Sequence, residues 1–81
     1  MKNIVGRRVQ EARKNLSLSQ EELIIQLELN GWKIGRVGLA KIEGGVRQVT
    51  DFEVMTLSKV LKVPLDWLMD QDEFEKRRKK E

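Results

Sequence analysis

Arg36 and Lys41 are two cations in a short stretch that is expected to be helical. Leu39 and Ile42 form an apolar pair with helical spacing, so the helix has an inward side and an outward side. Arg36, Val37 and Lys41 lie outside the apolar pair. Cationic side chains gathered on one exposed helix face are the groups that a polyanion such as nucleic acid contacts. The stretch therefore predicts a surface for nucleic acid.

A second short helix is expected just before this one, and its start is well marked. Ser19 and Glu22 have the spacing of a capping box, in which each side chain accepts a hydrogen bond from the backbone of the other residue. The glycine pair at 44–45 marks the end of the later helix. Two short helices, the second carrying outward cations, have the outline of a helix-turn-helix over about residues 19–44.

Three more helices are predicted around this pair. An apolar stripe of helical period predicts a first helix over residues 4–16. Thr50 opens a later helix with a second capping box. Pro64 suits the first position of a short final helix, in which Leu65 and Leu68 are expected to face inward.

The length of 81 residues predicts one domain, residues 1–69, followed by a charged tail, residues 70–81. The tail has acids first and bases last, an order that favours a helix. Three acid–base pairs in it have i, i+4 spacing: Asp72–Lys76, Glu73–Arg77 and Glu75–Lys79. The tail acids are expected in solvent rather than in a pocket: Asp70, Asp72, Glu73 and Glu75.

Composition excludes several classes of function. The chain has no cysteine and no histidine, which excludes disulfides, the usual zinc sites and catalysis by a serine–histidine or cysteine–histidine pair. It has no glycine-rich phosphate-binding motif and no apolar run near the roughly 20 residues of a membrane span. We therefore expect no metal, no cofactor, no enzymatic activity and no membrane association. The cytoplasm is the expected compartment, with nucleoid association when DNA is bound.

Positive charge is concentrated in two segments. The net charge is only +3, but residues 1–19 carry five cations against Glu11. Residues 33–47 hold four cations against Glu43. This distribution suits a polyanionic partner.

Four segments resemble, in order and nearly in spacing, the lambda-repressor-like helix-turn-helix family of Cro/Xre-type DNA-binding domains. They are VGRRVQEAR at 5–13, LSQEEL at 18–23, LAKIEGG at 39–45 and LSKVLKVPLDWL at 57–68. The resemblance covers residues 5 to 68 and implies a compact all-α fold of five helices.

The resemblance also implies roles for individual residues. Arg36, Val37 and Lys41 fall where the family reads base edges, and Arg or Lys can donate to guanine O6 and N7 while Val contacts a thymine methyl. Arg13 and Glu43 fall where relatives place a buried ion pair, whose members would be costly if left unpaired. Gln20, Arg47 and Gln48 fall where relatives contact the DNA backbone. We also expect contacts with the DNA backbone at Lys33 and Gly38.

The chain departs from the family pattern in two places. The connection over residues 28–34 is longer than usual, so either the preceding helix extends by a turn or the segment forms a loop. Gly35 and Gly38 replace small hydroxyl residues. Gly38 allows either a close approach to DNA or close packing against the preceding helix, and the sequence leaves both open. Trp32 can stack on a base or pack on the core, and packing is the commoner fate.

These features predict a sequence-specific, double-stranded DNA-binding transcriptional regulator, expected to be a repressor that binds an inverted repeat as a homodimer. A small core also favours oligomerisation. The alternative is an antitoxin-like or adaptor protein whose main partner is another protein. Its surface would include Phe52, Met55, Trp67 and the 70–81 tail.

Overall fold

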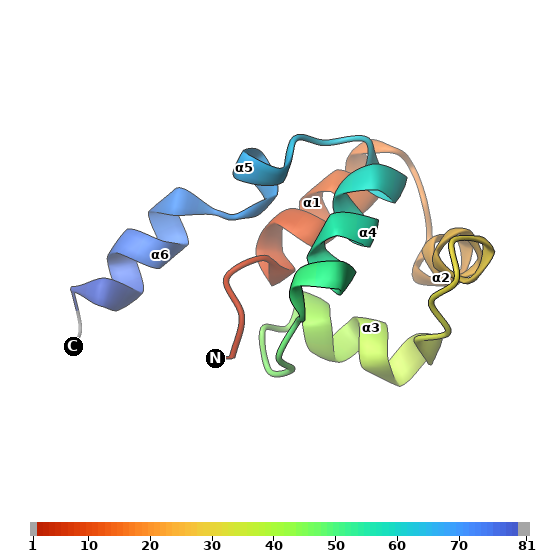
Figure 1. The fold of residues 1–81 in the computed structure, drawn as a ribbon, viewed down its shortest axis with the longest axis horizontal. Helices are drawn as coiled ribbons and strands as arrows, with labels where there is room; N and C mark the ends of the chain where they lie inside the picture. The colour runs from red at the N-terminus through yellow and green to blue at the C-terminus, as the bar shows by residue number, and fades with distance from the viewer. Residues whose placement is uncertain (1, 80–81) are drawn as a thin grey trace.

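The computed structural model describes residues 2–79, and these form helices without any strand (Figure 1). The elements are α1 (Gly6–Asn15), α2 (Gln20–Leu29), α3 (Gly35–Glu43), α4 (Asp51–Leu61), α5 (Leu65–Leu68) and α6 (Gln71–Arg78). The predicted all-α architecture is confirmed: α1 to α5 form a compact body, and α6 extends from it as a helical tail. Within the described part, no helix has the length and apolar character needed to cross a membrane.

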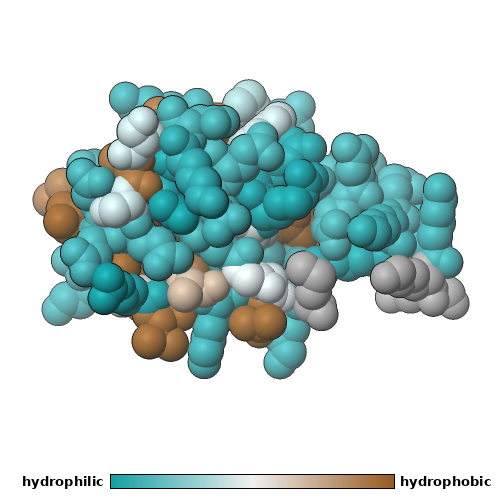
Figure 2. All heavy atoms as spheres, turned by 180° about the vertical axis from the view of Figure 1, so that it is seen from behind, coloured by the Kyte–Doolittle hydropathy of each residue, from teal (hydrophilic) through white to brown (hydrophobic). Residues whose placement is uncertain are grey.

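The core lies where α1 to α5 meet. Helix α1 packs against α3, α4 and α5, so it joins the two ends of the body. The far side of the molecule is largely hydrophilic, with apolar side chains mainly towards its edges (Figure 2). The apolar side chains buried in the core are Val5, Val9, Ala12, Leu23, Leu27, Leu39, Ile42, Val54, Leu57, Leu61 and Leu68.

Both predicted capping boxes are present. The Ser19 hydroxyl accepts from the backbone N–H of Glu22, and the Glu22 carboxylate accepts from the backbone N–H of Ser19 at 2.8 Å. That backbone hydrogen bond holds the pKa of Glu22 below its usual value. Thr50 and Glu53 make the same reciprocal contacts at the start of α4. These local signals therefore set where α2 and α4 begin.

The long connection between α2 and α3 is a loop, and α2 gains no extra turn. Helix α2 ends at Leu29, and Gly31 then adopts a left-handed φ of 89°. The N–H of Gly31 donates to the carbonyl of Glu28, and the N–H of Trp32 donates to that of Leu27, both at 3.0 Å. This is a Schellman motif, which ends a helix and turns the chain away. The Trp32 side chain is partly buried against the core.

Helix α5 is one turn long and differs from the sequence-based prediction at Pro64 and at Leu65. Pro64 lies at the N-cap, just before the first helical position. Leu68 is fully buried as expected, but Leu65 is 40% exposed and does not face inward. Residues three positions apart are offset by about 60° around a helix. Leu65 therefore lies at the edge of the buried side, where it lines a surface groove with Val49 and Met69.

The tail helix forms with fewer side-chain pairs than predicted. Within the described residues, Glu73 pairs with Arg77 at 3.0 Å, but the other two predicted i, i+4 pairs are absent. Glu75 instead pairs with Arg78, also at 3.0 Å. Asp70 is the N-cap of the helix, and its carboxylate accepts from the backbone N–H of Glu73.

Asp70 overturns the expectation that the tail acids lie in solvent. Its side chain is fully buried, and one carboxylate oxygen accepts from Arg7 at 2.7 Å while Arg8 approaches the other at 3.5 Å. Arg8 also stacks on the Trp67 ring at 4.7 Å and donates to the Trp67 carbonyl. Arg7 and Arg8, counted above among cations for a polyanion, therefore contact an anion of the protein itself. Trp67 is correspondingly covered on one face.

Candidate nucleic-acid interface

The two sides of α3 separate as predicted. Leu39 and Ile42 are fully buried, and they fix the helix to the core. Arg36, Val37 and Lys41 are all exposed. Val37 and Lys41 lie on the same face of α3 because they are four residues apart. Arg36 is turned by about 100° from Val37 around the helix, so it lies on the flank of that face. The structure therefore leaves all three predicted base-reading residues exposed.

Arg36 has an acidic neighbour that the sequence did not point to. Its guanidinium pairs with the carboxylate of Glu21, in the first turn of α2, at 3.0 Å. Both side chains are about two-thirds exposed, so the pair contributes little to folding. Lys41, in contrast, has no ion-pair partner among residues 2–79. The exposed surface of α3 thus contains one cation without an ion-pair partner in the described part and one that is paired across two helices.

A polar junction beneath this surface joins the first three helices. Arg13 donates to both carboxylate oxygens of Glu43, at 2.7 and 3.1 Å, and to the backbone carbonyl of Leu18. The predicted ion pair is therefore present. Both side chains are at least nine-tenths buried. A buried charge without a partner would be costly, and here each residue neutralises the charge of the other. This junction fixes the C-terminal end of α3 relative to α1.

Gln20 belongs to the same junction. Its side-chain amide donates to Glu43 at 3.1 Å, so Gln20 holds α2 against α3. An amide group carries two N–H donors, and this contact uses only one. Gln20 also begins α2, whose first backbone N–H groups have no acceptor within the helix. Its predicted contact with a phosphate remains compatible with this arrangement.

The structure explains both unusual glycines of α3. Gly35 has a φ of 75°, a left-handed conformation that glycine adopts without strain. A Cβ added to Gly38 would lie 2.9 Å from Cγ1 of Ile34, so this glycine makes room for a side chain of the preceding loop. The packing neighbour is thus Ile34 and not the preceding helix. Both glycines have a folding role, whatever Gly38 contacts in a complex.

The loop after α3 is held more firmly than expected for a segment that contacts DNA. Arg47 makes two hydrogen bonds to Glu53, each at 3.0 Å, and lies over the Trp32 ring at 5.9 Å. The hydrogen bonds from Arg47 lower the pKa of Glu53 and raise that of Arg47. Arg47 also donates to the carbonyl of Gln48. The structure thus gives Arg47 a folding role, and its contact with a DNA backbone stays a prediction.

Other polar groups border the α3 surface. Lys33, in the loop before α3, and Gln48, in the loop after it, both have exposed side chains. Lys2 is exposed, and its backbone N–H donates to the carbonyl of Gly45, just past α3. Lys33 and Lys2 have no ion-pair partner in the described part of the chain. These groups can contact phosphates on either side of a duplex groove.

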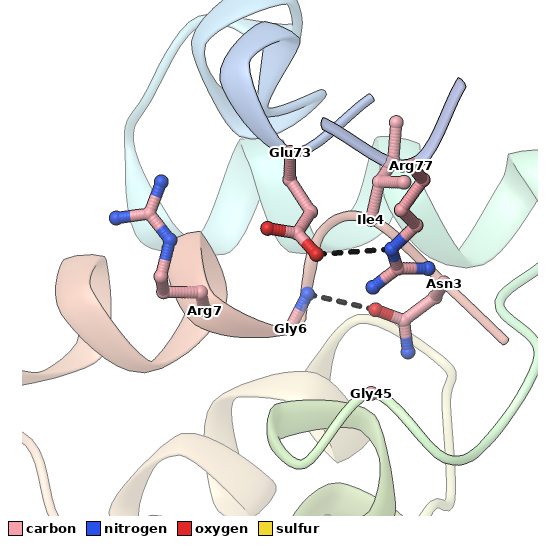
Figure 3. Close-up of a pocket in the computed structure, with 7 residues that line it drawn as sticks. All are labelled: Asn3, Ile4, Gly6, Arg7, Gly45, Glu73 and Arg77. Atoms are coloured by element: carbon pink, nitrogen blue, oxygen red, sulfur yellow. Dashed lines mark hydrogen bonds and ion pairs between the residues drawn. The ribbon is translucent and has the colours of Figure 1, made fainter. Parts of the chain in front are cut away.

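Asn3 and Gly6 were not singled out from the sequence, although they position α3 (Figure 3). The Asn3 side chain accepts from the backbone N–H of Gly6 at 2.8 Å and donates to the carbonyls of Ile42 and Arg47. A Cβ on Gly6 would overlap the carbonyl oxygen of Ile42. The N-terminal end of α1 therefore rests directly on the C-terminal end of α3, where their dipoles attract. No local signal predicts contacts between residues about 40 positions apart.

A small cavity lies between the N-terminal segment and α6 (Figure 3). Its volume is about 60 Å³, and residues from both ends of the chain line it, including Ile4, Glu73 and Arg77. Ligand pockets usually occupy about 300–1,000 Å³, so this space is too small for a typical metabolite.

Comparison with known proteins identifies no relative from which a function can be transferred. No family model matches the chain, and neither a curated protein nor a solved structure matches it. Any functional conclusion therefore depends on the geometry of α2, α3 and the loops beside them.

Proposed function

We propose that this chain is a sequence-specific, double-stranded DNA-binding transcriptional regulator that places α3 in the major groove of an inverted-repeat operator. The observation that carries the proposal is the division of α3 into two sides. Leu39 and Ile42 hold one side in the core, while Arg36, Val37 and Lys41 project from the other. An exposed helix with this set of side chains fits the major groove in width and in chemistry.

The side chains of α3 supply donors and an apolar contact for base edges. Lys41 is free to donate to guanine O6 or N7, and Val37 can contact a thymine methyl. Arg36 can make the bidentate contact that guanine favours once it leaves Glu21, and that exposed pair is weak. Occupation of an operator excludes other proteins from the same DNA, so repression is the regulatory effect that we propose.

The groups around α3 supply contacts to the phosphates. The first backbone N–H groups of α2 form a site for an anion at the positive end of the helix dipole. The second N–H of the Gln20 amide, together with Lys33, Gln48 and Lys2, borders the same surface. Such contacts set the register of α3 without reading sequence. Binding should therefore weaken steeply as salt concentration rises.

A binding selection from random duplex DNA tests this proposal. We expect an enriched motif with two-fold symmetry. Arg36→Ala and Lys41→Ala should each lose discrimination at particular base pairs, by about 1–3 kcal/mol for a good contact. Lys59→Ala, which removes an exposed cation from α4, is the matched control and should preserve the motif. Absence of any preference over random duplex at moderate salt would contradict the proposal.

A further inference from the structure

The tail helix α6 is held to the body mainly by polar contacts. None of its side chains is fully buried. Its N-cap, Asp70, is fully buried against Arg7 of α1. Glu73 and Arg77 line the small cavity together with the N-terminal segment and Gly45 (Figure 3). The helix therefore has a defined position on the body, although it adds no fully buried side chain to the core.

The acids in the middle of α6 are engaged within the helix, whereas two of its cations are not. Glu73 and Glu75 each pair with an arginine of the same helix, at 3.0 Å. Lys76 and Lys79 are exposed, and neither has an ion-pair partner among residues 2–79. They are three residues apart, so they are neighbours on the helix surface. These two lysines are called the basic end of α6 below.

The acid in the first turn of α6 does not cancel the charge of the basic end. Asp72 is exposed there, but it precedes Lys79 by seven residues, or roughly 10 Å along the helix axis. That separation exceeds the Debye length of about 8 Å at physiological ionic strength. An anion at the C-terminal end of α6 therefore meets mainly cations.

The basic end of α6 lies at the same edge of the molecule as α3. In Figure 1, α3 runs along the lower edge, the N-terminus reaches that edge, and α6 runs down towards it from α5. Gly45, just past α3, lines the same cavity as Arg77, in the last turn of α6. The longest dimension of the molecule is 38 Å, about three times the roughly 12 Å width of a major groove. When α3 occupies the groove, groups further along this edge can therefore reach the neighbouring sugar–phosphate backbone.

We propose that the basic end of α6 binds the backbone phosphates of duplex DNA beside the groove that α3 enters. The inference deepens the proposed function and rests on it for the identity of the polyanion. The ammonium group of lysine is a compact charge that donates to phosphate oxygens without a fixed geometry. Lys76 and Lys79 therefore add affinity without reading the base sequence. The tail extends the DNA contact beyond α2, α3 and the loops beside them.

The composition of α6 favours a phosphate backbone over a protein partner. Phe74, which is 45% exposed, is the only large apolar side chain of the helix. Protein interfaces are depleted in lysine, and clustered aromatic and apolar side chains anchor them. Phosphate contacts need no such cluster, because the release of counterions from DNA supplies free energy for binding.

Fluorescence anisotropy with duplex DNA at several salt concentrations tests the proposal. Lys76→Ala together with Lys79→Ala should weaken binding to any duplex by roughly 3- to 10-fold at low salt. The slope of the logarithm of the association constant against that of salt concentration should become shallower by about 1.8, or about 0.9 for each lost phosphate contact. Arginine at both positions keeps the charge and should retain the wild-type affinity and slope.

A second pair of lysines provides the matched control. Lys59 and Lys62 are also exposed and three residues apart, and they lie at the end of α4 that points away from α3 (Figure 1). Lys59→Ala together with Lys62→Ala should change the affinity and the slope much less. Thermal melts followed by circular dichroism should coincide for all variants, because every substituted side chain is exposed.

Three results would overturn the inference. The first is a loss of affinity at Lys76 and Lys79 no greater than that of the Lys59 and Lys62 control. The second is a salt slope that the alanine pair leaves unchanged. The third is a different motif in a binding selection repeated with the alanine pair, because phosphate contacts carry no sequence information.

The failure of this inference can be told apart from the failure of the proposed function. A chain that binds duplex without sequence preference, but with a slope that depends on Lys76 and Lys79, keeps the α6 contact and removes the regulator. A chain that selects a motif and tolerates the loss of both lysines keeps the regulator and removes the α6 contact. Absence of binding to any duplex at low salt would remove both.

Discussion

Two buried carboxylates join opposite ends of the molecule to α1, and they differ in the cations that surround them. Glu43, at the end of α3, pairs with Arg13, whose side chain is only 10% exposed. Asp70, between α5 and α6, is fully buried, but its closest partner, Arg7, is 57% exposed. The anion is withdrawn from water in both cases. Only at Glu43 is its closest cation withdrawn as well.

The effect of breaking a buried ion pair therefore depends on whether the charge that is left behind can reach solvent. A buried cation without its anion is strongly destabilising, whereas an exposed one can return to water. Two more arginine–carboxylate pairs have side chains that are more exposed to solvent. Arg47–Glu53 is partly exposed, and Arg36–Glu21 is mostly exposed. The four pairs should therefore contribute to folding in that order.

The largest effect on stability is expected for Glu43→Ala. It leaves Arg13 buried without an anion and removes the acceptor of the Gln20 amide, so it should lower the free energy of unfolding by about 3–5 kcal/mol. Urea denaturation measures this change. Lys41→Ala, on the exposed side of the same helix, is the control and should stay within about 0.5 kcal/mol of wild type. Equal losses from the two substitutions would contradict the role given to the junction.

Asp70→Ala should lower the free energy of unfolding by less than Glu43→Ala does, although Asp70 is at least as buried as Glu43. Arg7 can turn to solvent, and Arg8 keeps its contacts with Trp67. The remaining loss is the α6 cap, the short contact with Arg7 and the longer one with Arg8, so we expect about 1–3 kcal/mol. The same denaturation experiment measures it, with the exposed Asp72→Ala as control. A loss of unfolding free energy greater than that of Glu43→Ala would contradict the difference drawn between the two carboxylates.

The partly exposed pair of Arg47 and Glu53 should make the free energy of unfolding depend on pH. Hydrogen bonds, chiefly from Arg47, hold the pKa of Glu53 in the folded protein below its ordinary value of 4.5. The stabilisation is therefore present above that value and is lost as the pH falls through the lower, folded-state pKa. The difference in unfolding free energy between wild type and Glu53→Gln should be about 1 kcal/mol near neutral pH. It should shrink on acidification, and a difference independent of pH would contradict this account.

The smallest effect on stability is expected for Glu21→Gln. The pair with Arg36 is exposed, so its loss should change the free energy of unfolding by less than about 0.5 kcal/mol. DNA affinity should instead rise by roughly 3- to 10-fold at low salt, because an anion near the phosphates is removed and Arg36 is released. Fluorescence anisotropy with the selected duplex measures this change. Glu28→Gln, an exposed acid elsewhere on α2, should change affinity less.

Elements with local signals could be predicted from the sequence, and those built from distant contacts could not. The capping boxes at Ser19 and Thr50 and the glycines after α2 and α3 act within a few residues, so helix boundaries followed from them. The pairing of Arg13 with Glu43 was expected only because the chain resembles a family that has such a pair. Asp70 gave no signal, because its arginine partners lie about 60 positions earlier in the chain.

The helices, their apolar sides and the outward residues of α3 follow from short-range sequence patterns. Those properties depend on periodicity and on backbone hydrogen bonds between near neighbours. The tertiary structure decided which charges remain available: it directs Arg7, Arg8 and Arg13 towards carboxylates of the protein and leaves Lys41 open. The identity of a charged residue does not show whether it forms an ion pair. Its partner depends on how helices that are distant in the sequence pack together. Packing also leaves Phe52 and Met55 of α4 exposed.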